Sequence, residues 1–395
     1  MKKIKVGLLV GEFFTNDIPI YACKGGYGML ARNYICKYIP SDNIQIDVII
    51  GENNHPYMRI EKIDDTNLLY LPGSKSGLYH KIVGRISGQR RESILSIVDQ
   101  YDVFISIEFT NVTRFVMEYA SRNQKLILWI QDPRPQSDWD ELLSVSLVKQ
   151  NGYRPNKKTS SLVNKLYYEN RIVPITQGKC LVQKAIDLYD LPKEFMAKFV
   201  PNPIVIPQLD DNEISCKQNK IVSLGRLDSV KRPWIIAEVA KRMPQYDFYF
   251  CGQIHEMKMH EIMKPYLGLK NCHFAGHIEG NEKANLLRDS KILINSSIHE
   301  AIPISFLEAM SYGMLLVSNR NPDDLTSQFG IGVKQINGDG YDSVDSFVEA
   351  IENIMLHPEK YVQKALEARA YIQSHHSIDK FIGELRSLIE SSVKQ

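Results

Sequence analysis

The feature of this sequence that most restricts its fold is an alternation of short apolar runs with helical patterns, which occurs twice. In the first half, helical stretches such as 28–38 and 91–99 lie between strand-like, β-branched runs. These runs are Ile4–Val10, Ile44–Ile50, Val103–Ile107, Leu126–Ile130 and Ile172–Ile175. Continuous apolar strands separated by helices are typical of a parallel sheet with both faces covered. We therefore predict a doubly wound α/β domain in this half.

A proline-rich linker over 199–207 ends this pattern, and a polar stretch follows it through Lys220. The alternation then restarts, with strands expected at Ile221–Leu224, Phe248–Cys251, Cys272–Phe274, Ile292–Ile294 and Leu315–Ser318. The predicted fold class is α/β, with two Rossmann-like, doubly wound domains over 1–200 and 201–375. Open parallel sheets bind ligands at the carboxyl ends of their strands, so we expect a site where the two domains face each other across a cleft.

Composition supports two globular domains and excludes several other classes. The chain has 395 residues, of which 44% are hydrophobic and 24% charged, enough for two buried cores. A formal net charge of +2 gives no strong field for nucleic acid. Six scattered cysteines without a CxxC pair favour a reduced, cytoplasmic protein with no metal site. Apolar runs of about 18 residues do not occur, so we expect no membrane span.

A glycine-rich segment, Lys24-Gly-Gly-Tyr-Gly-Met-Leu-Ala31, is expected to open a helix. Backbone N–H groups at such a place can approach a phosphate, and the helix dipole adds to the attraction. Gly26-x-Gly28-x-x-Ala31, with Glu52 after the second strand, also matches the dinucleotide fingerprint. That fingerprint follows the first strand directly, whereas a polar loop over 12–24 intervenes here. A phosphate loop, a dinucleotide loop and a simple turn therefore stay open.

A basic loop, Gly225-Arg-Leu-Asp-Ser-Val-Lys-Arg-Pro233, follows the expected strand Ile221–Leu224. This context puts Arg226 and Lys231 at the carboxyl edge of the second sheet, where ligands bind. A guanidinium fork and a compact ammonium are well suited to a diphosphate. A basic loop that is merely solvated would have the same composition, so this motif gains weight only from its neighbours.

Two glutamates stand in the segment from Asn295 to Gly313. Glu300 is expected in a loop before a helix, because Pro303 suits a first helical turn and Gly313 suits a C-cap. Glu308 falls inside that apolar helix, where a carboxylate is costly to bury unless it accepts hydrogen bonds. Ribose hydroxyls would supply such donors. The spacing of the two glutamates is common by chance, but its context is not.

These motifs together resemble the retaining glycosyltransferases of family 4, which have the GT-B fold. Three segments carry the likeness: the signature helix Glu300–Gly313, the diphosphate clamp Gly225–Lys231 and the N-terminal glycine loop with Gly25–Gly26. The likeness covers residues 221–318 well and 44–198 more weakly.

The resemblance implies a role for each matching residue. The catalytic set would be Glu300, which holds the transferred sugar, with Arg226 and Lys231, which neutralise the leaving nucleoside diphosphate. The donor-binding set would be Gly25, Gly26, Gln131, Ile278, Ala301, Ile302, Pro303, Ile304 and Glu308. A closing helix within 376–395 would cross back to the first domain.

The implied reaction is transfer of a sugar, with retention, from a nucleoside-diphosphate sugar to a glycan or lipid-linked acceptor, as in polysaccharide biosynthesis. UDP is favoured over GDP, and neither a metal nor another cofactor is required. Two departures from the family pattern leave the donor sugar open. Gln131 stands where many relatives have a His, so it could bond the sugar but could not act as a base. Pro303 stands where many have Gly.

Three points stay open on the sequence alone. The basic stretch 73–91 fits a solvated loop, or a peripheral contact of this cytoplasmic protein with an anionic membrane or a lipid-linked diphosphate. An NAD-dependent oxidoreductase using Gly26–Ala31 is the alternative enzyme. A third class would bind sugar nucleotides without turnover, but the presence of Glu300, Arg226 and Lys231 argues against it.

Overall fold

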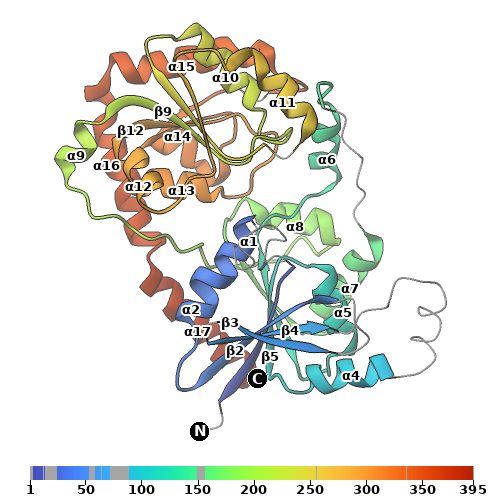
Figure 1. The fold of residues 1–395 in the computed structure, drawn as a ribbon. Coiled ribbons are helices and arrows are strands. Elements are labelled where there is room, and N and C mark those ends of the chain that lie inside the picture. Colours follow the sequence, from blue (N-terminus) through green and yellow to red (C-terminus); the bar gives the residue numbers. More distant parts are fainter. Residues whose placement is uncertain are drawn as a thin grey trace. The chain divides into compact units, whose positions relative to one another are not determined.

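The structure is a computed structural model that describes residues 3–11, 13, 25–52, 58–63, 65–71, 89–148, 156–254, 256–334 and 336–394. The chain divides into two compact units (Figure 1). Unit 1 comprises 1–133, 155–202 and 378–395, and unit 2 comprises 134–154 and 203–377. Among the described residues, no helix is long and apolar enough to cross a membrane.

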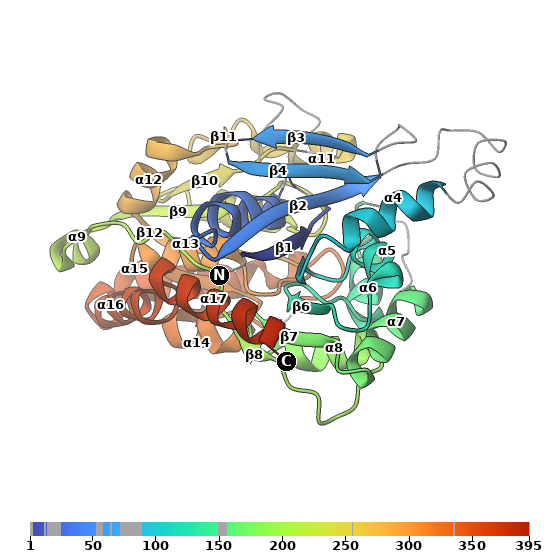
Figure 2. The same cartoon turned by 90° about the horizontal axis from the view of Figure 1, so that it is seen from below.

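Unit 1 contains an eight-stranded sheet with the order β3-β4-β2-β1-β5-β6-β7-β8. The strands are β1 Ile4–Leu9, β2 Ile44–Glu52, β3 Arg59–Ile63, β4 Thr66–Leu71, β5 Val103–Ile107, β6 Lys125–Ile130, β7 Ile172–Thr176 and β8 Lys198–Phe199. All neighbouring strands pair in parallel except β3 and β4, which form an antiparallel pair at one edge (Figure 2). The central strands β5 and β6 are buried almost throughout, as their β-branched composition predicts.

The helices of unit 1 are α1 Gly25–Leu30, the π-helical turn η1 Ala31–Ile35, α2 Cys36–Tyr38, α4 Gln89–Val98, α5 Asn111–Tyr119, α7 Lys157–Tyr168, α8 Leu181–Tyr189 and α17 Ile378–Lys394. Helix α17 comes from the far end of the chain. Its Phe381 ring stacks on Trp129 of β6 at 5.6 Å, and Arg386 donates to the carbonyls of Tyr38, Ile39 and Pro40. Apolar burial and these bonds hold the C-terminal helix to the first unit.

Unit 2 contains a six-stranded, wholly parallel sheet with the order β11-β10-β9-β12-β13-β14. Its strands are β9 Gln218–Leu224, β10 Asp247–Cys251, β11 Cys272–Gly276, β12 Ser290–Asn295, β13 Leu315–Ser318 and β14 Gly330–Gly332. Along β12, Ile292 and Ile294 belong to one apolar core while Leu293 belongs to another. Since alternate side chains point to opposite faces, both faces of this sheet are covered.

The helices of unit 2 are α6 Gln136–Leu143, α9 Asp211–Ser215, α10 Pro233–Arg242, α11 Met257–Met263, η2 Lys264–Tyr266, α12 Gly280–Asp289, α13 Ile304–Ser311, η3 Pro322–Asp324, α14 Leu325–Phe329, η4 Tyr341–Ser343, α15 Val344–Leu356 and α16 Pro358–His375. The predicted α/β class with two Rossmann-like, parallel-sheet units is confirmed. The sequence analysis had assigned all of 1–200 to the first domain, whereas residues 134–154, which include α6, cluster with the second unit.

Candidate active site

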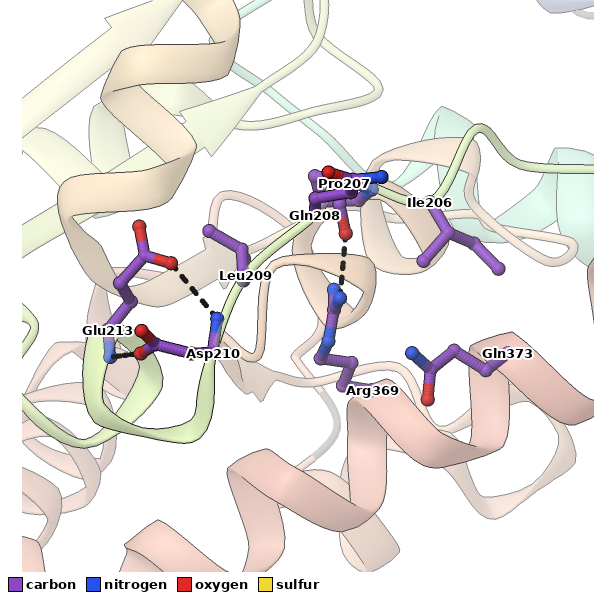
Figure 3. A pocket seen from close by; sticks show the side chains of 8 residues that line it. All are labelled: Ile206, Pro207, Gln208, Leu209, Asp210, Glu213, Arg369 and Gln373. Carbon is purple, nitrogen blue, oxygen red and sulfur yellow. Dashed lines mark hydrogen bonds between the residues drawn. The ribbon is translucent and has the colours of Figure 1, made fainter.

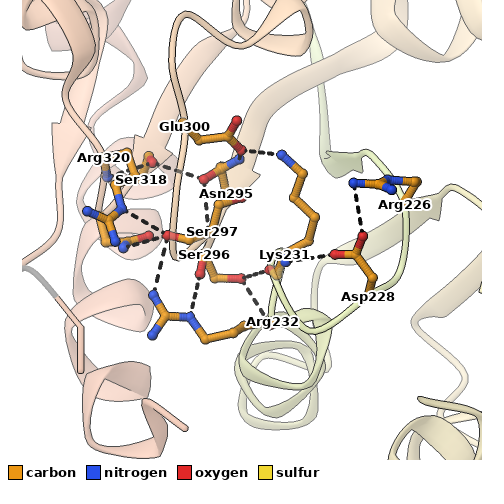
Figure 4. A network of polar contacts seen from close by, with 11 residues as sticks. Arg226, Asp228, Lys231, Arg232, Asn295, Ser296, Ser297, Glu300, Ser318 and Arg320 are labelled. Atoms are coloured by element: carbon orange, nitrogen blue, oxygen red, sulfur yellow. Dashed lines mark hydrogen bonds and ion pairs between the residues drawn. The ribbon is translucent and has the colours of Figure 1, made fainter. Parts of the chain in front are cut away.

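The centre of the candidate site is a contact between Lys231 and Glu300. Lys231 lies in the loop after β9 and Glu300 in the loop after β12, and these strands are neighbours in a parallel sheet. The Lys231 Nζ donates to Glu300 Oε1 at 2.5 Å, and Asn295 Nδ2 donates to the same oxygen at 2.8 Å (Figure 4). The structure thus brings together two of the residues assigned to catalysis from sequence, at the edge where ligands of such sheets bind.

The charge of Glu300 is held by its neighbours. Burial acts to raise the pKa of Glu300, but the Lys231 ammonium and the hydrogen bonds to the carboxylate outweigh burial, so this pKa lies below its usual value. The Glu300 side chain is only 8% exposed, while that of Lys231 is 26% exposed. At neutral pH the site therefore contains an ionised, largely buried carboxylate beside an ammonium that reaches solvent.

Arg226 occupies the same loop but has a different partner. Its guanidinium is 61% exposed and lies 3.2 Å from the buried carboxylate of Asp228 (Figure 4). Gly225, before it, has φ +148°, a conformation that only glycine adopts readily. The strand-to-loop turn therefore needs glycine at this position, and it leaves the Arg226 side chain at the surface. The structure does not pair Arg226 with Glu300.

A buried arginine, Arg232, organises the loops of the site, and the sequence analysis assigned it no role. Its guanidinium donates to the carbonyls of Ser296, Ser297, Ile336 and Gly338. Burial lowers the pKa of Arg232 to about 10, so it remains charged at neutral pH. Cationic bonds to carbonyls after β12 fix the segment that leads to Glu300. The only sequence signal for this role is a charged residue directly before the proline of an apolar helix.

The signature helix α13 begins after Pro303 and ends before Gly313. Pro303 is the N-cap residue, and Gly313 has φ +69° just past the helix end, so both sequence-based boundary assignments hold. Glu308 lies within the helix, 22% exposed, and accepts from Lys283 Nζ of α12 at 2.6 Å. The Glu308 carboxylate therefore does not depend on ribose hydroxyls for a donor, because Lys283 already provides one. Its contact with a ribose stays a prediction.

The loop between Glu300 and α13 packs against the core. Ala301 and Ile302 are 7% and 5% exposed, and Ile304 begins the helix. Ile278, in the turn between β11 and α12, belongs to the same apolar cluster as Ile302. The side chains of this loop are apolar, so any polar contact that it makes with a ligand must come from its backbone.

The glycine pair of the first unit lies at the start of a helix. Helix α1 begins at Gly25, and Gly26 is exposed in its first turn. Strand β1 ends at Leu9, so the glycines do not follow the strand directly, as a dinucleotide fingerprint requires. This spacing disfavours the NAD-dependent alternative. The contribution of Gly25 and Gly26 to a donor site stays a prediction.

Gln131 has another role from the one proposed for it. It follows β6, is 2% exposed, and exchanges two amide hydrogen bonds with Asn202, at 2.9 and 3.1 Å. Asn202 also donates to Gln177 at 2.6 Å, and Gln177 donates to the Gln131 carbonyl. Both ends of the Gln131 side chain are used inside the first unit, so the expected contact of this amide with the donor sugar is not supported. Sequence alone could not reveal partners 46 and 71 residues away.

Glu108, also missed from sequence, fixes the turn after β6. It has φ +60°, and its carboxylate accepts from the backbone of Gln131 and Asp132 and from the Tyr189 hydroxyl at 2.6 Å. Burial raises the pKa of Glu108, although these bonds oppose the rise. A strained backbone with a buried acid is a feature of functional regions. Here its visible effect is to shape the exit from β6.

A separate hollow of about 500 Å³ lies where the linker 206–210 runs over α16 (Figure 3). Arg369, which lines it, donates to the carbonyls of Pro207 and Ser311 and so ties the linker to α16 and α13. None of the residues assigned to the candidate site lines this hollow. Of the basic stretch 73–91 predicted from sequence, residues 73–88 lie outside the described residues, so the structure gives no account of it.

Two Rossmann-like units, one with a lysine–glutamate pair at the carboxyl edge of its sheet, define a GT-B protein. Residues 207–371 match the family model described as "Glycosyl transferases group 1". The second unit is therefore a group 1 glycosyl transferase domain, and the protein is a glycosyltransferase. No curated protein sequence matches the chain.

Solved structures of the same fold are similar to nearly the whole chain. Sucrose-phosphate synthase from Thermosynechococcus elongatus matches with TM-score 0.70 and 12% identity, covering 98% of this chain and 99% of that one. HepE from Anabaena, in complex with UDP, matches with TM-score 0.65 and 13% identity over 99% and 100%. TarM from S. aureus, in complex with UDP and glycan ligands, matches with TM-score 0.62 and 11% identity over 98% and 100%. At these identities the likeness establishes the fold.

Proposed function

We propose that the protein transfers a sugar from a nucleoside-diphosphate sugar, with UDP as the favoured nucleotide, to a glycan or lipid-linked acceptor with retention. The observation that carries this proposal is the 2.5 Å contact between Lys231 and Glu300 within the group 1 domain. UDP is favoured because HepE was solved with UDP and with UDP-glucose, and TarM with UDP. Glycan acceptors are favoured because WaaG, another similar structure, is described as involved in lipopolysaccharide biosynthesis.

The chemistry follows from the charges at the site. Cleavage of the glycosyl–phosphate bond leaves negative charge on the departing diphosphate, and fixed cations stabilise that charge in the transition state. Lys231 and Arg226 would provide these cations, without a metal. In the free protein Asp228 and Glu300 hold the two side chains in place. A diphosphate would compete with Asp228 for the exposed Arg226.

Glu300 would bind the hydroxyls of the donor sugar. Its ionised carboxylate can accept hydrogen bonds, and the low pKa keeps it from serving as a general acid at neutral pH. For retention, the acceptor oxygen would attack on the face that the diphosphate leaves. Its proton would pass to the departing phosphate oxygen, so that one C–O bond forms as the other breaks.

The test combines ligand screening with one substitution. Thermal shifts against UDP, GDP, ADP and NADH, followed by turnover of the matching sugar nucleotides, identify the donor; a true ligand at saturating excess raises stability by a few kcal/mol. Glu300→Gln should then lower kcat at least about 100-fold while the affinity for UDP changes little. Glu261→Gln, on the exposed face of α11, is the matched control. Full turnover by Glu300→Gln, or binding of NADH alone, would refute the proposal.

A further inference from the structure

The segment 134–148, which includes α6, contacts the loop that carries Glu300, although its place in the chain puts it among strands of the first unit. Its Leu142, Val145 and Val148 side chains belong to the core of unit 2. Polar contacts then bind it at three further places. We refer to 134–148 as the α6 segment.

The first polar contact is next to the proposed catalytic glutamate. The Asp138 carboxylate lies 2.7 Å from Nδ1 of His299, the residue before Glu300. The two side chains are 16% and 7% exposed, so both are largely withdrawn from water. Withdrawing such polar groups costs solvation energy that their mutual attraction scarcely recovers, so a pair of this kind is weak support for stability alone. It does restrict the orientation of the His299 backbone, and hence of Glu300.

The second contact acts on the start of the same loop. Glu141 forms an ion pair with Arg320, whose Nε donates to the Ser297 carbonyl at 3.0 Å. The Ser297 carbonyl also accepts from Arg232 and from Asn319. Three donors on one carbonyl fix the loop before Glu300, and Glu141 orients one of them.

The third contact anchors the end of the α6 segment. The Asp339 carboxylate accepts from the backbone of Ser146 and Leu147 at 2.8 and 3.0 Å. Asp339 directly follows Gly338, whose carbonyl accepts from Arg232. The α6 segment is thereby connected to the same arginine that fixes the Ser296 and Ser297 carbonyls.

We infer that the α6 segment positions the Glu300 loop, with Asp138 and Glu141 as positioning residues for the transfer reaction. This inference rests on the proposed function for its kinetic consequence, but its structural consequence does not. The Glu300 loop is also bonded to the Lys231 loop, through the Ile298 N–H and the Val230 carbonyl at 2.7 Å. Release of His299 should therefore loosen the loop and lower kcat, because small misplacements of a substrate-binding group are costly.

The experiment compares Asp138→Asn with Asp140→Asn in the full chain. Asp140 lies on the exposed face of α6, so its substitution removes the same charge from the same helix. Hydrogen exchange is followed over residues 295–303 in the free protein, and the affinity for UDP and the kcat with the productive sugar nucleotide are measured. Asp138→Glu, which restores a carboxylate, tests rescue and serves if Asp138→Asn does not fold.

We expect Asp138→Asn to accelerate exchange in 295–303 and to lower kcat about tenfold, with the affinity for UDP changed less than about twofold. Asp140→Asn should change none of these, and Asp138→Glu should recover part of kcat. Unchanged exchange and kcat in Asp138→Asn would overturn the inference while leaving the proposed function intact. A wild-type protein that binds no nucleoside diphosphate would instead refute the proposed function, and the exchange data would still decide whether Asp138 positions the loop.

Discussion

Replacement of Lys231 by methionine tests the electrostatic interpretation of the site through stability rather than through activity. The change keeps most of the side-chain volume and removes the ammonium, so Glu300 keeps Asn295 as a donor but loses its counter-charge. Breaking a buried ion pair by removing one partner costs about 3–5 kcal/mol. Because Lys231 is 26% exposed and solvent weakens the attraction, we expect a loss at or just below the lower end of this range, about 2–3 kcal/mol.

That loss corresponds to a fall in Tm of about 5–10 °C for the group 1 domain. The fall should depend on pH in a definite direction. The folded-state pKa of Glu300 is lowered from the ordinary value of 4.5, so the stability from the pair is complete above that value and is lost as pH falls through the folded-state pKa. The difference in Tm between wild type and Lys231→Met should be full at pH 7.5 and should narrow as the pH falls below about 4.5.

Two further variants control this experiment, with Tm measured by circular dichroism. Lys283→Met removes the partner of Glu308, but that pair is more exposed, at 29% and 22%, so its loss should cost about 1 kcal/mol or less. The double variant Lys231→Met with Glu300→Gln removes both charges and should recover at least half of the lost Tm. A Lys231→Met protein as stable as wild type at pH 7.5, or no recovery in the double variant, would refute the reasoning.

Two other predictions concern the backbone of the site and the C-terminal helix. Gly225→Ala should lower stability by about 1–3 kcal/mol because its φ of +148° is strained for alanine, whereas Gly332→Ala, which meets open space at an ordinary φ, should change urea unfolding little; equal effects would contradict this account. Phe381→Ala should cost about 3–5 kcal/mol, because Phe381 is 2% exposed and stacks on Trp129, while Val393→Ala, at a 40% exposed position, should cost well under 1 kcal/mol; thermal unfolding of both variants decides the point.

Most of the fold could be predicted because it depends on local patterns. Buried parallel strands are continuous apolar runs, so Val103–Ile107 and Leu315–Ser318 were located to the residue. The antiparallel pair β3 and β4 was missed, since Arg59–Ile63 lies at the sheet edge and is largely exposed and polar. An edge strand needs no apolar face, and its pairing is therefore invisible in composition.

The candidate site was predictable only in part. Lys231 and Glu300 were identified because each follows a strand, and parallel strands place their carboxyl ends at one edge. The partners of Gln131 and Glu308 were not, because Asn202 and Lys283 lie 71 and 25 residues away in sequence. Such pairs depend on how the elements pack, which the local pattern does not contain.

The sequence by itself determined the α/β class, the two Rossmann-like units and the loops that carry Lys231 and Glu300, since hydrophobic periodicity and glycine or proline at turns act over a few residues. Tertiary structure alone decided which side chains meet: Arg232 with four carbonyls, Glu108 with the turn after β6, and the α6 segment with the Glu300 loop. The physical reason is that hydrogen bonds and ion pairs reach only about 3 Å, so their partners are set by packing and not by order along the chain.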